Sequence, residues 1–311
     1  MMSGLTILDG GMGRELAQRG APFRQPEWSA LALYEAPEAV REVHRDFVRS
    51  GAQIITTNSY ALVPFHIGEA RFAADALRLA DLCGRLAREA VETEGKSPRC
   101  RIAASIPPLF GSYRHDLFRT GRAAEIAQPL IDGQAPYADL WLFETQSAAA
   151  ETLAVLPLLP DDGKPRWAAF TLHDETDGSG RAETPFSDGL PHLRSGETVA
   201  EAVEKIAQTG VSALLFNCCR PEVVEAAVRA ACDTLNRLNR TDIRLGAYAN
   251  AFPPQTENAT ANEGLDELRG ELTPPVYLAW AEKWRQAGAS IIGGCCGIGP
   301  EHIRCLAEHL R

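Results

Sequence analysis

Eight short apolar segments alternate with helical segments along the chain, and this alternation is the feature that most restricts its fold. Strands that alternate with helices form parallel sheets with right-handed crossovers. Eight such units favour a closed (β/α)8 barrel of the TIM type, an α/β fold, over the alternative of an open doubly wound sheet. The strands are expected at residues 5–9, 52–57, 101–105, 140–144, 167–171, 213–217, 244–249 and 290–292.

The chain is expected to form a single domain over residues 1–311. No change in composition marks a linker, and α/β barrels of about 250 residues or more fold as one unit. Proline at the start and glycine after the end mark several of the helices. The helices are expected at residues 14–19, 37–50, 71–94, 123–131, 148–156, 199–208, 221–239, 275–287 and 300–310.

The composition restricts the partners of the protein. Its formal net charge is −10, which argues against a nucleic-acid partner, because phosphate binding needs basic patches. No apolar run is long enough to span a membrane, and the first residues lack a signal-peptide pattern, so we expect a cytoplasmic protein with small-molecule partners. Eight cysteines in 311 residues are too sparse for a disulfide scaffold.

Three cysteines lie where expected strands end. Cys218 follows the segment 213–217, and Cys295 and Cys296 stand in a Gly-Gly-Cys-Cys-Gly turn after the last strand. The carboxyl ends of barrel strands meet at one face, where barrel enzymes place their active sites. Three thiolates leave one open position on a tetrahedral zinc ion, and a bound thiol stays deprotonated near pH 7. The alternative is that the three are small buried residues that pack beside glycines.

The remaining cysteines and the histidines are weaker candidates. Side chains of adjacent residues in an extended segment point opposite ways, so only one of Cys218 and Cys219 is expected to face the metal. No histidine has a partner at metal-ligand spacing, and none is assigned to the metal. Four further cysteines are expected to serve in packing: Cys83, Cys100, Cys232 and Cys305.

Five motifs in chain order resemble the homocysteine S-methyltransferase family. They are Leu-Asp-Gly-Gly at 8–11, Thr-Thr-Asn-Ser-Tyr at 56–60, Phe-Glu-Thr at 143–145, Phe-Asn-Cys at 216–218 and Gly-Gly-Cys-Cys-Gly at 293–297. The match covers nearly the whole chain. The resemblance implies a (β/α)8 barrel and a zinc ion held by three cysteines. It also implies transfer of a methyl group to the sulfur of homocysteine, which gives methionine.

The resemblance also implies roles for residues near the amino end of the substrate. Asp9 resembles the carboxylate that receives the homocysteine ammonium, and Glu144 a second acidic partner for it. The amides of Gly10 and Gly11 are expected to meet the substrate carboxylate. Because a buried charge requires a partner, two carboxylates around one cation are physically reasonable. The alternatives are a turn-capping role for Asp9 and a structural salt bridge for Glu144.

Further residues are placed around the site by the same motifs. Thr56 and Tyr60 stand where the family has pocket residues that border the substrate and the donor. Asn217 is expected to bind the substrate or to orient the zinc site by contacting the metal ligands, and Asn250 is a further candidate for this role. For Thr56 and Tyr60 the alternative is an ordinary loop hydroxyl and a packing aromatic.

The segment 106–114 departs from the family pattern. Members that use S-methylmethionine typically carry Gly-Pro-Tyr-Gly after the third strand, whereas this chain has Ile-Pro-Pro-Leu-Phe-Gly-Ser-Tyr-Arg. Phe110 and Tyr113 offer aromatic faces for a cationic donor, and Arg114 argues against one beside it. The expected donor is a sulfonium, S-methylmethionine or S-adenosylmethionine. A betaine-like donor, another thiol acceptor and a non-catalytic zinc barrel remain as alternatives, and the sequence leaves the oligomeric state open.

Overall fold

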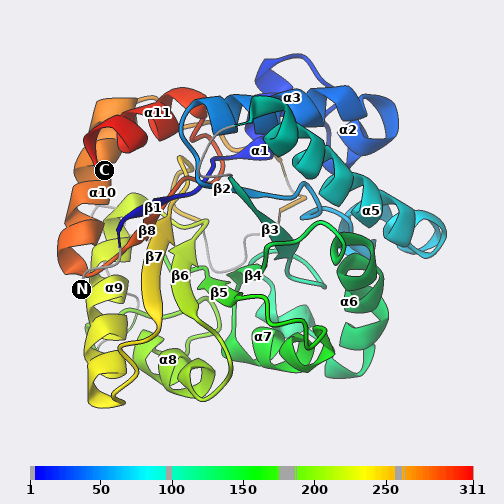
Figure 1. Cartoon of the computed structure of the whole chain (residues 1–311). Coiled ribbons are helices and arrows are strands. Elements are labelled where there is room, and N and C mark those ends of the chain that lie inside the picture. Colours follow the sequence, from blue (N-terminus) through cyan, green and yellow to red (C-terminus); the bar gives the residue numbers. More distant parts are fainter. Residues whose placement is uncertain are drawn as a thin grey trace.

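The computed structural model describes residues 4–95, 100–174, 186, 188–255, 261–262 and 264–310. Its eight parallel strands form a central sheet with helices around it (Figure 1), so the predicted (β/α)8 barrel is confirmed. The strands are β1 (Thr6–Ile7), β2 (Ile54–Thr56), β3 (Arg101–Ile106), β4 (Leu140–Gln146), β5 (Arg166–Phe170), β6 (Ala213–Asn217), β7 (Arg244–Tyr248) and β8 (Ile291–Ile292).

Hydrogen bonds between the first two strands close the ring. The sheet runs in the order β1-β8-β7-β6-β5-β4-β3-β2. Its two ends meet where Leu8 forms a parallel bridge with Ile54 and the amide of Gln53 donates to the carbonyl of Ile7 at 2.8 Å. A doubly wound sheet has two open edges and a reversal of strand order. The closure therefore excludes that alternative.

The strands are buried on both faces, as parallel strands between a barrel interior and a layer of helices must be. On β4, Leu140 and Leu142 pack with the residues that fill the barrel. Trp141 and Phe143 pack into the outer core beneath the helices. Apolar residues along the strands thus fill both cores, and the polar residues at the carboxyl ends of the strands form the face where a site can be built.

The helices surround the barrel, and none in the described part of the chain combines the length and apolar character needed to cross a bilayer. They are α1 (Met12–Gln18), α2 (Ala30–Glu35), α3 (Pro37–Arg49), α4 (Pro64–Ile67), α5 (Glu69–Glu94), α6 (Thr120–Gln134), α7 (Ala149–Val155), α8 (Val199–Ala207), α9 (Pro221–Arg237), α10 (Pro274–Ala287) and α11 (Pro300–His309), with short 3-10 turns at His115–Leu117 and Leu156–Leu158.

The structure differs from the predicted elements mainly in the loops. The short helices α2 and α4 lie in segments for which no helix was predicted. Helix α6 continues past Pro129, which lies inside it. The first and last strands comprise only two residues each, although backbone hydrogen bonds continue beyond them, from the amide of Gly293 to Ala247 and from that of Gly294 to Asp9. Half of the predicted loop 173–196, residues 175–185 and 187, lies outside the described residues.

Candidate metal centre and substrate cavity

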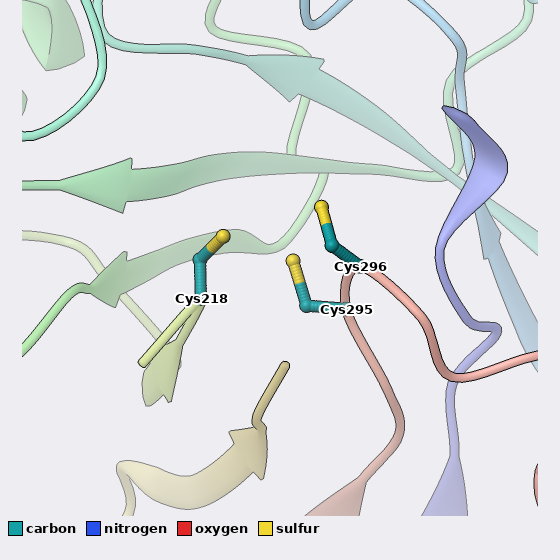
Figure 2. A group of neighbouring side chains, drawn as sticks. All are labelled: Cys218, Cys295 and Cys296. Atoms are coloured by element: carbon teal, nitrogen blue, oxygen red, sulfur yellow. The ribbon is translucent and has the colours of Figure 1, made fainter. Parts of the chain in front are cut away.

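Three cysteine sulfurs meet at the carboxyl end of the barrel. Cys218 directly follows β6, whereas Cys295 and Cys296 follow β8, which is separated from β6 by β7. Figure 2 shows the three side chains gathered together, and their Sγ atoms all lie within 4.8 Å of one another. Sulfurs bound at about 2.3 Å to a tetrahedral zinc ion are roughly 3.8 Å apart. The spacing and the thiol chemistry therefore fit such an ion.

Hydrogen bonds between neighbouring strand ends hold the backbone of the cluster. The amide of Cys295 donates to the carbonyl of Ala249 at 2.9 Å, and the amide of Ala251 donates to the carbonyl of Cys296 at 2.8 Å. Cys218 has a φ of +51°, a left-handed conformation that turns the chain sharply at the end of β6. The continuation of β7 thus links the turn after β8 to the cysteine after β6.

Contacts within the cluster favour negative charge on one sulfur. Hydrogen bonds from Cys295 and then from Cys296 hold the pKa of the Cys218 thiol well below its usual range. The hydroxyl of Tyr113 lies 3.2 Å from Cys218 Sγ, and the side-chain amide of Asn250 donates to the same sulfur at 3.8 Å. The cluster therefore favours a thiolate, the form that binds metal.

Cys219 does not belong to the cluster. Its side chain is fully buried in the outer core, and that burial raises the pKa of its thiol. Within the described residues, the group of potential metal ligands comprises only the three clustered cysteines. Such a set provides three thiolates and leaves a fourth tetrahedral position for a ligand, as in catalytic zinc sites.

The turn after β1 touches the cluster at Gly11. A methyl group on Gly11 would lie 2.6 Å from the carbonyl oxygen of Cys295 and 2.9 Å from the Cα of Cys296, closer than atoms pack. Because these neighbours are backbone atoms, they move only if the whole cysteine turn moves.

We therefore expect Gly11→Ala to weaken metal binding at least about tenfold, since changes to groups that position metal ligands lower metal affinity about 10–100-fold. Gly121→Ala, in helix α6 where nothing lies within 4 Å of the added methyl, is the control. The measurement is zinc content after dialysis against a graded chelator. Equal retention by both variants would show that the contact between Gly11 and the cysteine turn is unimportant.

A cavity of about 170 Å³ opens beside the cysteine cluster. A larger hollow of about 450 Å³ between α1, α3 and α11 contains neither the cysteines nor the predicted carboxyl groups, so we place the site in the smaller cavity. Besides the three cysteines, the lining of the smaller cavity includes the following predicted substrate residues: Asp9, Gly10, Gly11, Thr56, Tyr60 and Glu144.

Two buried carboxyl groups face this cavity. Asp9 accepts hydrogen bonds from the amide of Thr56 at 2.7 Å and from its hydroxyl at 3.1 Å, and burial raises the pKa of Asp9 to about 7. Glu144 accepts a hydrogen bond from the hydroxyl of Ser105, and burial raises the pKa of Glu144 to about 8. Neither carboxyl forms an ion pair in the described part of the chain. A ligand cation between them would supply the missing partner.

Comparison with known proteins gives the site its context. The family model described as homocysteine S-methyltransferase matches residues 6–310. The chain belongs to the homocysteine S-methyltransferase family. The homocysteine S-methyltransferase of Escherichia coli is 31% identical over 97% of this chain and 94% of its own length. Homocysteine S-methyltransferase 1 of Zea mays is 29% identical over 99% of this chain and 95% of its own length.

A solved structure supports the same assignment. The metallated form of the Escherichia coli homocysteine methyltransferase superposes with a TM-score of 0.74 at 29% identity, covering 99% of this chain and 96% of that chain. The protein is thus a methyltransferase of this family. The cysteine cluster is the group in the described structure that fits a metal.

Two residues singled out in the sequence have contacts that differ from those predicted for this family. The amide of Gly11 donates to the carbonyl of Ile298 at 2.9 Å, so it is not free to meet a substrate carboxylate. Asn217 does not line the cavity; its side chain accepts from the amide of Thr145 at 2.9 Å and donates to the Thr145 hydroxyl at 2.8 Å. Asn217 therefore holds the turn at Thr145, whose left-handed φ of +58° needs support.

The loop that departs from the family pattern does not offer the two aromatic faces that we predicted. Phe110 packs edge-on against Phe118 and is absent from the cavity lining. The ring of Tyr113 does line the cavity, but the guanidinium of Arg194 lies 4.9 Å from its centroid. Arg114 pairs with Asp116 outside the cavity. The Tyr113 face next to Arg194 is thus already occupied by a cation.

The structure adds cavity residues that sequence reasoning missed. Phe23 and Trp28 come from the segment before α2 and meet edge-to-face, with ring centroids 5.6 Å apart. Phe252 follows β7, and Tyr248 is the last residue of that strand. Aromatic residues in a segment without an apolar period give no sequence signal, whereas Tyr248 was recognisable by its place at a strand end.

Proposed function

We propose that this protein transfers a methyl group from a sulfonium donor, S-methylmethionine or S-adenosylmethionine, to the thiol of L-homocysteine, giving methionine. We further propose that it does so with a zinc ion held by Cys218, Cys295 and Cys296. One observation supports both parts most strongly. Three thiols that fit a metal and two buried carboxyls without a cationic partner line the same cavity. Homocysteine carries a thiol at one end and an ammonium group at the other.

The two carboxyls would orient the amino-acid end of homocysteine. Asp9, held by Thr56, and Glu144, held by Ser105, would both lose their protons as the ammonium enters, because the arriving positive charge lowers the pKa of each. The amide of Gly10, which also lines the cavity, is the remaining candidate for the substrate carboxylate. Binding at both ends of homocysteine would fix the direction in which its sulfur points toward the methyl group of the donor.

At the other end, the metal would supply one piece of chemistry: zinc bound by three thiolates is a weak Lewis acid that holds an incoming thiol as thiolate near neutral pH. The protein itself would exclude water from the place where the homocysteine sulfur binds. Tyr113 and Asn250 contact Sγ of Cys218, one of the proposed metal ligands, and would keep water from that side of the site. A desolvated thiolate is the better nucleophile for attack on the donor methyl group.

The donor would enter from the aromatic side of the cavity. Phe23 and Trp28 line the cavity, and such aromatic rings would attract a sulfonium cation together with the acidic residues of the cavity. The thiolate sulfur would form the new bond to the methyl carbon as the carbon–sulfonium bond breaks, and its electron pair would leave with the neutral thioether. No proton moves in this step, so no acid is required.

The test is methionine formation from homocysteine with a panel of donors, together with the zinc content of the purified protein. We expect about one zinc ion per chain and activity with one of the two sulfonium donors. Activity with glycine betaine alone, or with another thiol but not homocysteine, would replace the proposed donor or acceptor. Activity that survives complete removal of zinc would contradict the proposed role of the metal.

A further inference from the structure

Tyr248 lines the cavity and carries a buried hydroxyl group. It is the last residue of β7, packs with the residues that fill the barrel interior, and is only 4% exposed. Burial raises the pKa of its hydroxyl, and the negative charge of Glu144 raises it further. The two carboxyl groups, Asp9 and Glu144, line the same cavity.

This hydroxyl has no hydrogen-bond partner. Several other buried side-chain atoms in the described part of the chain also lack one, but only that of Tyr248 belongs to a residue that lines this cavity. A buried hydroxyl without a partner costs about 1–3 kcal/mol. A hydroxyl that is retained at such a cost beside a ligand cavity points to a polar atom of the ligand as its partner.

The chemistry of the proposed substrate identifies that atom. A primary ammonium group has three N–H donors. Asp9 and Glu144 provide acceptors for two of them, and a third acceptor is needed inside a buried cavity. Other buried groups nearby are already engaged: Thr56 donates to Asp9, and Ser105 donates to Glu144.

We propose that the Tyr248 hydroxyl oxygen accepts the third N–H of the substrate ammonium and so helps the protein to select a thiol with a free α-amino group. This inference rests on the proposed function. Tyr248 is a positioning residue in this scheme, because it contacts the amino end of the substrate rather than the reacting sulfur. An N-methylated or amino-free thiol would leave its hydroxyl without a partner.

The experiment compares Tyr248→Phe with the unchanged protein on two thiols, homocysteine and 4-mercaptobutanoate, which lacks only the amino group. We expect kcat/KM for homocysteine to fall about 10–100-fold, mostly through KM, as for the loss of a hydrogen bond to a charged group. We expect kcat/KM for 4-mercaptobutanoate and the zinc content to remain unchanged. Tyr137→Phe, which removes a hydroxyl bound to Asp81 outside the cavity, is the control.

The outcomes separate the inference from the proposed function. Equal losses with both thiols would assign Tyr248 a structural role and overturn the inference, as would an unchanged kcat/KM for homocysteine. If the unchanged protein methylated neither thiol with any donor, the proposed function itself would fail, whatever the variant did.

Discussion

Replacing Cys296 by alanine is expected to abolish both zinc retention and methyl transfer to homocysteine. Cys296 is one of three sulfurs within 4.8 Å of one another, and no other potential ligand in the described residues joins the group. Two thiolates cannot hold the ion firmly, and the substrate thiol then stays largely protonated at pH 7. Mutation of residues that merely contact the metal ligands already lowers metal affinity or activity about 10–100-fold. Loss of a ligand itself should therefore lower kcat/KM more than about 100-fold. Zinc analysis and methionine formation provide the two measurements.

Cys219→Ala is the matched control for this prediction. Cys219 is adjacent to Cys218 but is buried in the outer core, so its removal creates only a small void. We expect this variant to lose about 1 kcal/mol of stability and to retain zinc and activity. Full activity in Cys296→Ala, with a circular dichroism spectrum like that of the unchanged protein, would refute the proposed metal centre.

Replacing Glu144 by glutamine is expected to stabilise the empty protein while it weakens homocysteine binding strongly. Burial raises the pKa of Glu144 to about 8, so the folded protein holds a proton there between about pH 4.5 and 8 that the unfolded chain has released. The unfolded state then binds fewer protons, and stability falls as pH rises through this window. Glutamine has nearly the same shape as glutamate but cannot ionise, so the variant does not lose this stability as the pH rises. We expect an unfolding midpoint at pH 8 about 2–4 °C higher, the shift for 1 kcal/mol.

The same substitution removes one charge from the pair that would receive the substrate ammonium. Leaving a buried ammonium short of one charged partner costs about 3–5 kcal/mol, so kcat/KM for homocysteine should fall at least about 100-fold. Zinc content should not change, because Glu144 lies outside the cysteine cluster.

Glu151→Gln separates the two effects of this change. Glu151 in α7 is also buried, with its pKa raised to about 8, but it accepts from the amide of Ser147 and does not line the cavity. We expect the same pH-dependent gain in stability and no change in kcat/KM. Unaltered homocysteine kinetics in Glu144→Gln would show that Glu144 does not bind the ammonium.

Much of this arrangement could be predicted because it depends on order along the chain. Each strand of a parallel barrel presents its carboxyl end to the same face, so the order of residues predicts that Asp9, Glu144 and the cysteines are neighbours. The orientation of Cys219 followed from the alternation of side chains along an extended segment. These features are set by the backbone period and the topology.

Other features depend on loop conformation and hydrogen bonding, which the residue order does not determine. The amide of Gly11 was expected to meet substrate, but the turn after β8 brings the carbonyl of Ile298 against it. Asn217 was expected to orient the metal site, but the left-handed turn at Thr145 engages both ends of its side chain. The aromatic residues Phe23 and Trp28 reach the cavity through an irregular segment with no recognisable period.

The sulfur coordination of the bound metal, measured by X-ray absorption with and without homocysteine, tests the central claim most directly. We predict three sulfur ligands and one lighter ligand in the protein alone, and four sulfur ligands once homocysteine is added. A sulfur count that stays the same on addition of homocysteine, or four sulfur ligands already present without it, would contradict the proposed site.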